Sequence, residues 1–106
     1  MASRTSKKKT ADVSVGAKMQ AQAEQAAELL KALSNPQRLR VMCLLIDGER
    51  TVGEINTEIE LSQSALSQHL GKMRALRLVE TRRNGQTIYY SLASSEARAV
   101  LETLYR

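Results

Sequence analysis

The spacing of hydrophobic residues changes after Leu78, and this change limits the possible folds more than any other feature of the chain. Upstream, apolar residues recur at three- and four-residue steps, which is typical of helices that pack by one face. Downstream, the runs "LVETRR" and "QTIYYSL" are β-prone and are separated by Asn84-Gly85, a pair that favours a type I′ turn. The pattern therefore predicts a helical body followed by a β-hairpin. The hairpin residues expected to face inward are Val79, Ile88, Tyr90 and Leu92.

Helical segments precede and follow this hairpin. The first, "KMQAQAEQAAELLKALSN", is rich in Ala, Gln, Glu and Leu. Pro36 opens the second, "PQRLRVMCLLID", because the missing N–H of proline costs nothing in a first helical turn, and Gly48 ends it. The third is "TVGEINTEIE", and the segment after the hairpin is "SSEARAVLETLYR".

A fourth helix lies within "LSQSALSQHLGKMRALRLVE" and follows the third after only Leu61 and Ser62. Its apolar stripe is Leu66, Leu70, Met73 and Leu76, and Ser62 stands where an N-cap is expected. Two helices joined this closely form a helix-turn-helix. With the hairpin, the predicted fold is mainly α with a small β-hairpin, a winged helix-turn-helix over residues 19–106. Residues 1–18 are polar and basic and are expected to form a disordered N-terminal arm.

Charge is distributed unevenly along the chain. Of the net charge of +5, residues 1–18 and residues 72–83 each carry +4, whereas residues 19–60 carry −3. A basic block directly after a Ser- and Gln-rich helix is the footprint of a polyanion-binding surface, although charge alone is equally typical of a solvated face. The sequence contains no run of 18 apolar residues and no secretory signal, so a cytoplasmic location is expected.

The fourth helix carries side chains suited to reading base edges. Gln offers a donor and an acceptor to adenine, and Ser serves either type of base in the major groove. Arg82 and Arg83 lie beside the hairpin tip, where they can meet phosphates or a minor groove. For His69, a structural or phosphate-contacting role is favoured over direct base reading. The candidate DNA-binding residues are Ser62, Gln63, Ser64, Ser67, Gln68, His69, Lys72, Arg82, Arg83 and Gln86.

The same residues bear on two other functional classes, enzymes and modules that bind RNA or protein. No enzymatic activity is predicted, because the only cysteine and the only histidine, Cys43 and His69, fall in separate helices. The sequence also contains no Gly-rich phosphate loop, paired-carboxylate signature or metal motif. A winged helix that binds RNA or another protein is the stronger rival, since the basic residues Lys7 to Lys9 would serve RNA equally well.

The segments "ALSNPQRLRVMCLL", "VGEI" and "LSQSALSQHLGKMRALRLVETRRNGQTIYYSL" resemble the ArsR family of bacterial winged-helix repressors. The similarity spans roughly residues 22–106 and is greatest to the sulfide- and thiol-responsive branch of that family. It implies a homodimer joined through the first and last helices, which binds double-stranded operator DNA at an inverted repeat and releases it on meeting an inducer. The expected interface residues are Leu29, Leu33, Leu101 and Leu104.

Many members of that family sense metals, but the residues of this chain argue against metal binding. The third helix has no sulfur or imidazole where the family carries its cysteine pair, and the last helix has no histidine. One cysteine and one histidine cannot make a closed site, so neither a metal nor any other cofactor is expected.

Cys43 has two possible roles. Free cysteine is among the most buried residue types, and Cys43 lies in the most apolar run of the chain, which favours a core residue. The resemblance instead implies a thiol switch, because the thiol-responsive branch carries a cysteine here and pairs it with another near the end of the last helix. This chain has one cysteine, so it is either a shortened version or works with a single thiol. A small thiol-reactive inducer would then form a mixed disulfide, persulfide or sulfenate at Cys43.

Overall fold

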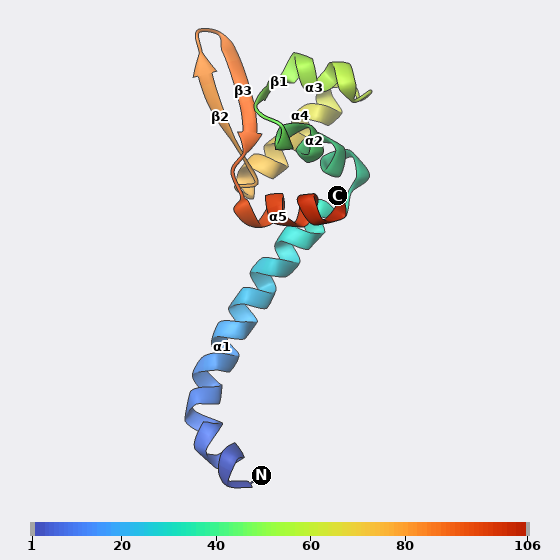
Figure 1. Cartoon of the computed structure of the whole chain (residues 1–106). Helices are drawn as coiled ribbons and strands as arrows, with labels where there is room; N and C mark the ends of the chain where they lie inside the picture. The colour runs from blue at the N-terminus through green and yellow to red at the C-terminus, as the bar shows by residue number, and fades with distance from the viewer. Residues whose placement is uncertain (1, 106) are drawn as a thin grey trace. The chain divides into compact units, whose positions relative to one another are not determined.

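The structure is a computed structural model that describes the backbone of residues 2–105 and the side chains of residues 15–105. Over these residues the order of elements is α1-α2-β1-α3-α4-β2-β3-α5 (Figure 1). The chain divides into two compact units, Met1–Lys31 and Ala32–Arg106. The second unit contains the helix-turn-helix and the hairpin, so the predicted fold class is confirmed.

The first unit consists almost entirely of helix α1, which spans Ala2–Leu33. The helix therefore begins upstream of residue 19, where the sequence analysis placed the start of the folded domain. Val15, Met19 and Leu30 are each at least half exposed along it. The division at residue 18 between an arm and a DNA-binding domain stays a prediction.

Side-chain caps set the starts of α2 (Pro36–Ile46) and α3 (Val52–Glu58). Asn35 Oδ1 accepts two backbone N–H groups of the first turn of α2, at 3.0 and 3.1 Å. At α3, Thr51 Oγ1 accepts the N–H of Glu54 at 3.1 Å, while the N–H of Thr51 donates to the Glu54 carboxylate at 2.9 Å. This reciprocal capping box satisfies two donors that the first turn would otherwise leave unpaired.

Helix α4 spans Gln63–Ala75 and ends in a turn that usually requires glycine. The N–H of Arg77 donates to the carbonyl of Arg74 at 3.0 Å, and the N–H of Leu78 donates to the carbonyl of Met73 at 2.9 Å. These are the two hydrogen bonds of a Schellman motif, whose residue after the C-cap adopts the left-handed conformation. That residue is Arg77, with φ of 61°.

Three antiparallel strands form one sheet in the order β1-β3-β2. They are β1 (Arg50–Thr51), β2 (Val79–Asn84) and β3 (Thr87–Leu92). The β2–β3 hairpin is the predicted wing. The sequence analysis missed β1, because a two-residue strand has no hydrophobic period to detect.

The hairpin turn lies one residue further along than predicted. Asn84 pairs with Thr87 in the ladder, so the loop residues are Gly85 and Gln86. Of these two, only Gly85 has a positive φ, at 66°. A single positive φ at the first central position is the pattern of a type II′ turn, which favours glycine there, so the predicted type I′ turn is wrong.

One face of each helix in the second unit supplies the core. The buried hydrophobic residues are Ala32, Leu33, Val41, Met42, Leu45, Ile55, Ile59, Leu66, Leu70, Met73, Leu78, Val79, Ala97 and Leu101. Helix α2 contains the most apolar run of the chain, yet Cys43, Leu44 and Ile46 are only half-buried. In α5 (Ser95–Leu104), Leu101 is fully buried, and Arg98 ties the helix to α2 by donating to the carbonyl of Ile46 at 3.1 Å.

Replacing Arg77 by glycine is expected to raise the free energy of unfolding by about 1 kcal/mol, since glycine adopts a positive φ without steric cost. Chemical denaturation measures this change. Arg74→Gly is the matched control, because the same substitution inside α4 should lower stability by about 1 kcal/mol. If Arg77→Gly were also destabilising, the left-handed turn would not be the source of strain.

Candidate DNA-binding surface

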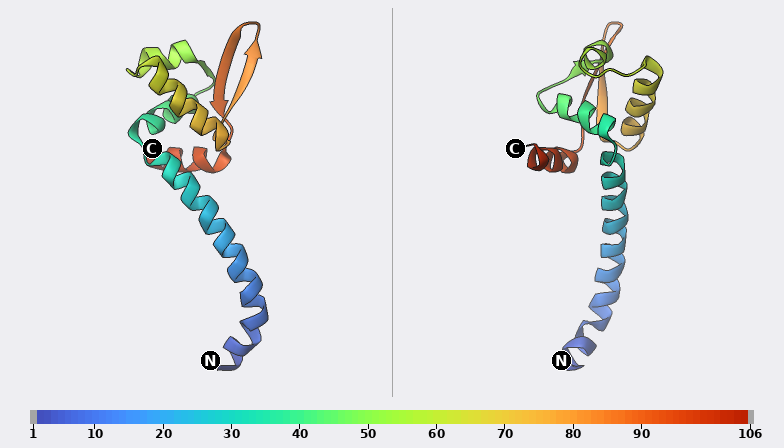
Figure 2. Two further views of the ribbon diagram at one scale, coloured as in Figure 1. Left: turned by 180° about the vertical axis from the view of Figure 1, so that it is seen from behind. Right: turned by 90° about the vertical axis from the view of Figure 1, so that its right-hand side faces the viewer.

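The outer face of α4 presents amide and hydroxyl groups to solvent. Leu66, Leu70 and Met73 face the core and are at most 2% exposed, which fixes the rotation of the helix. The predicted polar residues of α4 are then exposed: Gln63, Ser64, Ser67, Gln68 and Lys72. In the right-hand view of Figure 2, α4 lies along one edge of the unit, and its exposed polar residues face solvent there.

The start of α4 is suited to a negatively charged partner. Ser62 is exposed and caps the helix by accepting the N–H of Ala65 at 3.1 Å, as the sequence predicted. Its hydroxyl proton remains able to donate to a phosphate oxygen. No acidic residue lies in the first turn of α4, whereas Lys72 and Arg74 lie in the last turn. The positive end of the helix dipole is therefore left for an anion.

His69 lies at the boundary between this face and the core. Its side chain is half-buried, and its pKa is below the ordinary value of 6.5, mainly because burial disfavours the charged imidazole and further because Arg38 is nearby. Burial therefore favours the neutral form of the imidazole. Of the roles considered for His69, this environment fits a structural one.

The wing places its two adjacent arginines on opposite faces of the sheet, because successive side chains of a strand alternate. Arg83 shares the face of Val79, which is buried against the body, and Arg83 itself is exposed. Gln86 is exposed in the turn. Both remain available to a ligand that covers α4 and the wing tip.

Arg82, in contrast, is engaged within the chain. Its guanidinium donates two hydrogen bonds to the carboxylate of Glu49 and lies 4.5 Å from the ring centroid of Tyr89. The sequence analysis did not single out Glu49 or Tyr89 for this surface. No local pattern could have done so, because Glu49 and Arg82 are 33 residues apart.

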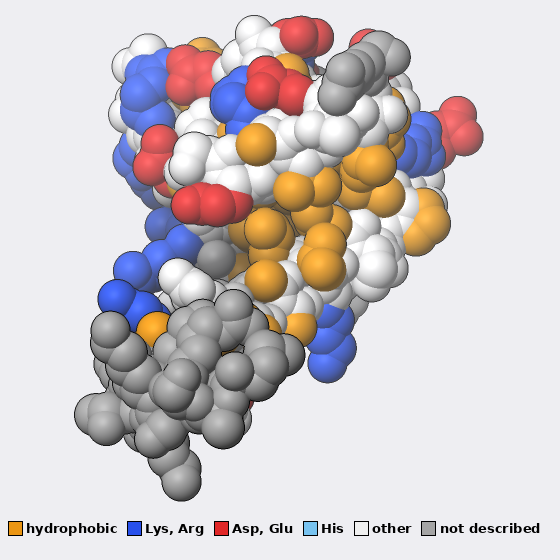
Figure 3. Space-filling model, turned by 60° about the horizontal axis from the view of Figure 1, so that its bottom comes forward, with side chains coloured by type: hydrophobic (Ala, Val, Ile, Leu, Met, Phe, Trp, Pro, Cys, Tyr) orange, Lys and Arg blue, Asp and Glu red, His pale blue; other side chains and the backbone are white. Residues whose placement is uncertain are grey.

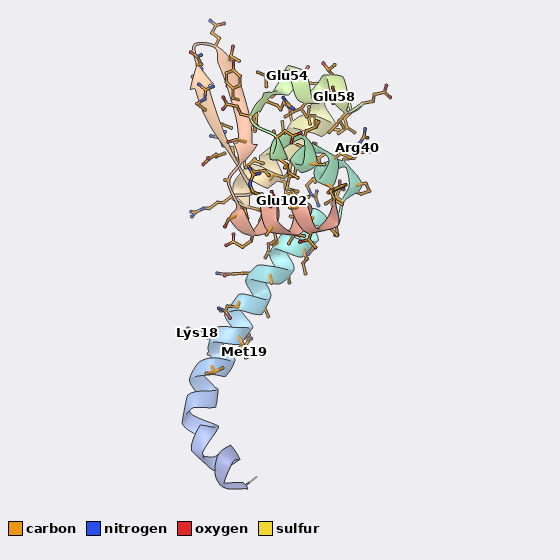
Figure 4. All side chains as sticks on the ribbon, in the orientation of Figure 1. Lys18, Met19, Arg40, Glu54, Glu58 and Glu102 are labelled. Carbon is orange, nitrogen blue, oxygen red and sulfur yellow. The ribbon has the colours of Figure 1, made fainter. Side chains whose placement is uncertain are left out.

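Cys43 lines a surface cavity of about 330 Å³ rather than the closed core. The cavity is also lined by Arg40 on α2, Glu58 on α3 and Tyr105, and Figure 4 labels the first two. Cys43 is half-buried, so its thiol is more accessible than the apolar sequence around it indicated.

Neither a metal cluster nor a membrane span is found in the part of the chain that the structure describes. Among its His, Cys, Asp and Glu residues, no group of three or more could hold a metal ion. None of its helices has the length and apolar character needed to cross a bilayer.

A helix-turn-helix whose second helix exposes a polar face beside a β-wing defines the chain as a winged helix-turn-helix protein of the DNA-binding type. The sequence profile described as "Bacterial regulatory protein, arsR family" matches residues 35–81. The transcriptional activator HlyU of Vibrio cholerae is 48% identical over 88 residues, which cover 83% of this chain and 82% of HlyU. The chain therefore belongs to the ArsR family, whose members are transcription regulators and not enzymes.

Solved structures agree with this assignment. The reduced form of Vibrio cholerae HlyU matches with a TM-score of 0.80 at 47% identity, covering 84% of this chain and 94% of that one. The transcriptional repressor BigR of Xylella fastidiosa matches with a TM-score of 0.77 at 43% identity, covering 83% and 90%. Mb0332 of Mycobacterium bovis, described as a homodimeric winged helix-turn-helix DNA-binding domain, matches with a TM-score of 0.73 at 32% identity, covering 82% and 81%.

Proposed function

We propose that this chain is a repressor that binds an inverted-repeat operator as a dimer and releases it when Cys43 is modified by a small thiol-reactive molecule. The outer face of α4 carries the proposal, because exposed amide and hydroxyl groups stand on a helix whose opposite face is held in the core. The relatives include both an activator and a repressor. We choose repression because, in this proposal, the protein occupies its operator until the inducer modifies Cys43, and the regulated genes stay silent until then. The protein would act in the cytoplasm, on double-stranded operator DNA.

In this proposal α4 enters the major groove with its N-terminal half at the bases. Gln63 and Ser67 lie one turn apart on the exposed side and read base edges, with Ser64 and Gln68 beside them. Lys72 contacts a phosphate at the far end of the helix. Ser62, Arg83 and Gln86 contact the backbone from the start of α4 and from the wing tip.

Gln63→Ala and Ser67→Ala should each weaken operator binding by about 1 to 3 kcal/mol while leaving binding to random duplex almost unchanged. Arg83→Ala should weaken binding to every duplex and reduce the slope of log affinity against log salt by about one unit. Fluorescence anisotropy titrations at several salt concentrations measure both effects.

The same titrations test the class of ligand. Inverted-repeat duplex should compete at least about a thousandfold better than random duplex or single-stranded RNA. Equal competition by RNA would overturn the operator assignment. A parallel loss of specific and non-specific binding in Gln63→Ala would mean that this residue positions the helix and does not read a base.

Exposed apolar residues support the proposed dimer. Figure 3 shows hydrophobic side chains gathered on one side of the molecule, and Leu104 and Tyr105 at the end of α5 are 62% and 51% exposed. In α1, Leu30 is 57% exposed. A domain of this size gains stability by covering such side chains in a second copy. The relative from Mycobacterium bovis is described as homodimeric.

The burial of individual leucines changes the expected interface. Leu101 is completely buried and Leu33 is 5% exposed within the chain itself, so they contribute to the core and offer almost no surface to a partner. The sequence analysis could not separate these two roles, because adjacent positions of an amphipathic helix share one apolar stripe. Leu104 remains in the proposed interface, and Leu29 is half-buried.

Leu104→Glu should give a folded monomer with weakened operator binding, since a charge at this exposed position harms only an interface that buries it. Sedimentation velocity measures the assembly state, and circular dichroism confirms folding. Leu101→Glu is the contrasting variant and should unfold, because it places a charge in the core. If Leu104→Glu remained a dimer with full operator affinity, the dimer interface would not include the end of α5.

The position of Cys43 supports its proposed regulatory role. It lies on α2, whose buried residues pack against the same core as α4, and the two helices are in contact. Sulfur or oxygen atoms added to this thiol enter the cavity beside Arg40 and Tyr105, and they act on α4 where they press on the packed side chains of α2. Because paired recognition helices must match half-sites about one DNA turn apart, a small shift of α4 can be enough to release the operator.

Persulfide or polysulfide donors should dissociate the wild-type complex, whereas Cys43→Ser should bind operator DNA normally and ignore them. Mass spectrometry of the treated protein, run beside a DNA titration, tests this expectation. If Cys43 stayed unmodified, or was modified without loss of operator affinity, it would be a structural residue.

A further inference from the structure

Three side chains cross the outer face of the wing, the face opposite to Val79. Arg82 on β2 and Tyr89 on β3 are direct partners in the antiparallel ladder, so their side chains lie on the same face. The guanidinium carbon of Arg82 lies 4.5 Å from the centroid of the Tyr89 ring, which is within the range of a cation–π interaction. Arg82 therefore covers the central strand of the sheet.

Beyond Tyr89, the guanidinium of Arg82 reaches Glu49, which directly precedes the other edge strand, β1. Arg82 Nε donates to Oε2 of Glu49 at 3.1 Å, and Nη2 donates to Oε1 at 2.5 Å. This paired geometry orients both groups, as a single contact would not. The pKa of the Glu49 carboxyl is lowered mainly by the Arg82 hydrogen bond, and the pKa of Arg82 is raised mainly by the same bond.

These contacts engage one edge and one face of the Arg82 guanidinium, while the side chain as a whole is 54% exposed. The edge formed by Nε and Nη2 is bonded to Glu49, and one face of the guanidinium lies on Tyr89. Arg83, its neighbour, points to the other face and has no such partner carboxylate among the interactions of the described residues. The two adjacent arginines therefore differ: Arg82 is paired with a carboxylate of the same chain, and Arg83 is not.

The position of the Glu49–Arg82–Tyr89 cluster within the sheet is equally informative. Strand β1 pairs with β3 only at Tyr89 and Tyr90, so from Arg83 to Ile88 the wing is a two-stranded ribbon with no third strand beside it. An isolated two-stranded ribbon is marginally stable and free to bend. The cluster lies at the last ladder position that the third strand supports. The direction of the wing tip is therefore set at this point.

Strand β1 also connects the cluster to the helix-turn-helix. Thr51, the second residue of β1, is the N-cap of α3, so Glu49 is only two residues from the N-cap of the first helix of the pair. The interaction between Glu49 and Arg82 therefore links the wing to the helix-turn-helix formed by α3 and α4.

We propose that Glu49, Arg82 and Tyr89 form a wing brace that holds the hairpin at a fixed angle to the helix-turn-helix, and that Arg82 is a positioning residue that does not itself contact DNA. The brace acts through Arg83 and Gln86 by keeping the wing tip in place for the duplex. This inference rests on the proposed DNA contacts of α4 and the wing.

A double-mutant cycle with operator DNA tests the brace. Glu49→Gln and Arg82→Gln should each lower operator affinity by about two- to fivefold, and combining them should cost no more than either alone. The slope of log affinity against log salt should fall by clearly less than one unit in all three variants, because Arg83 is less well placed for its phosphate but is still present. Arg83→Gln is the matched control, the same substitution one residue away on the opposite face, and should reduce the slope by about one unit.

A charge-swapped double variant separates a brace from direct contact more sharply. Combining Glu49→Arg with Arg82→Glu keeps the net charge and allows the ion pair to form in reverse. If the brace is correct, the swapped protein should bind the operator better than Arg82→Gln does. ¹⁵N relaxation of Arg83 to Ile88 should show increased mobility in Glu49→Gln and recovery in the swapped protein.

Other results would overturn the brace. If Arg82→Gln lowers the salt slope by about one unit, or if Glu49→Gln raises operator affinity, Arg82 contacts a phosphate and Glu49 competes with it. A swapped variant that binds worse than Arg82→Gln has the same meaning. These results contradict the brace but leave the proposed function intact. If Arg83→Gln instead leaves both the operator affinity and the salt slope unchanged, Arg83 does not contact DNA, and both the proposed wing contact and the brace are wrong.

Discussion

The packing of α4 against α2 is the interaction on which the rest of the structure depends. Leu66 and Met73 on α4 are completely buried, as are Val41 and Met42 on α2, and the two helices are in contact. Burying one such side chain contributes about 1.5 to 3 kcal/mol, so several together fix the rotation of a 13-residue helix. The polar residues of α4 can then point only outward, and the DNA-binding surface is a consequence of how the core is filled.

The same packing directs the wing. The chain leaves α4 through the left-handed turn at Arg77 and enters β2 with Leu78 and Val79 buried, and the N–H of Ala93 closes the base of the hairpin on the carbonyl of Leu78 at 2.9 Å. The base of the wing is thus part of the core, whereas its tip is solvated. A ribbon of this kind needs a contact on its exposed face to hold a direction, and the wing brace supplies one.

Helix α2 joins the DNA-binding surface to the candidate thiol switch. Its buried residues support α4, while Cys43 lies half-buried at a surface cavity beside Arg40 and Tyr105. In the proposed function, a modification of Cys43 acts on α4 through the buried residues that the two helices share.

The sequence by itself determined the helix-turn-helix, the wing and the polar face of α4, because caps, hydrophobic periods and hairpin signals act over a few residues. Ser62 as an N-cap and the stripe of Leu66 and Leu70 are of this kind. Only the tertiary structure decided that β1 completes the sheet, that Leu101 belongs to the core, and that Arg82 is paired with Glu49 while Arg83 is exposed. These features depend on contacts between residues that are distant in sequence. The residues around Arg82 or Leu101 would show the same local sequence pattern whichever distant residue they contacted in the folded chain.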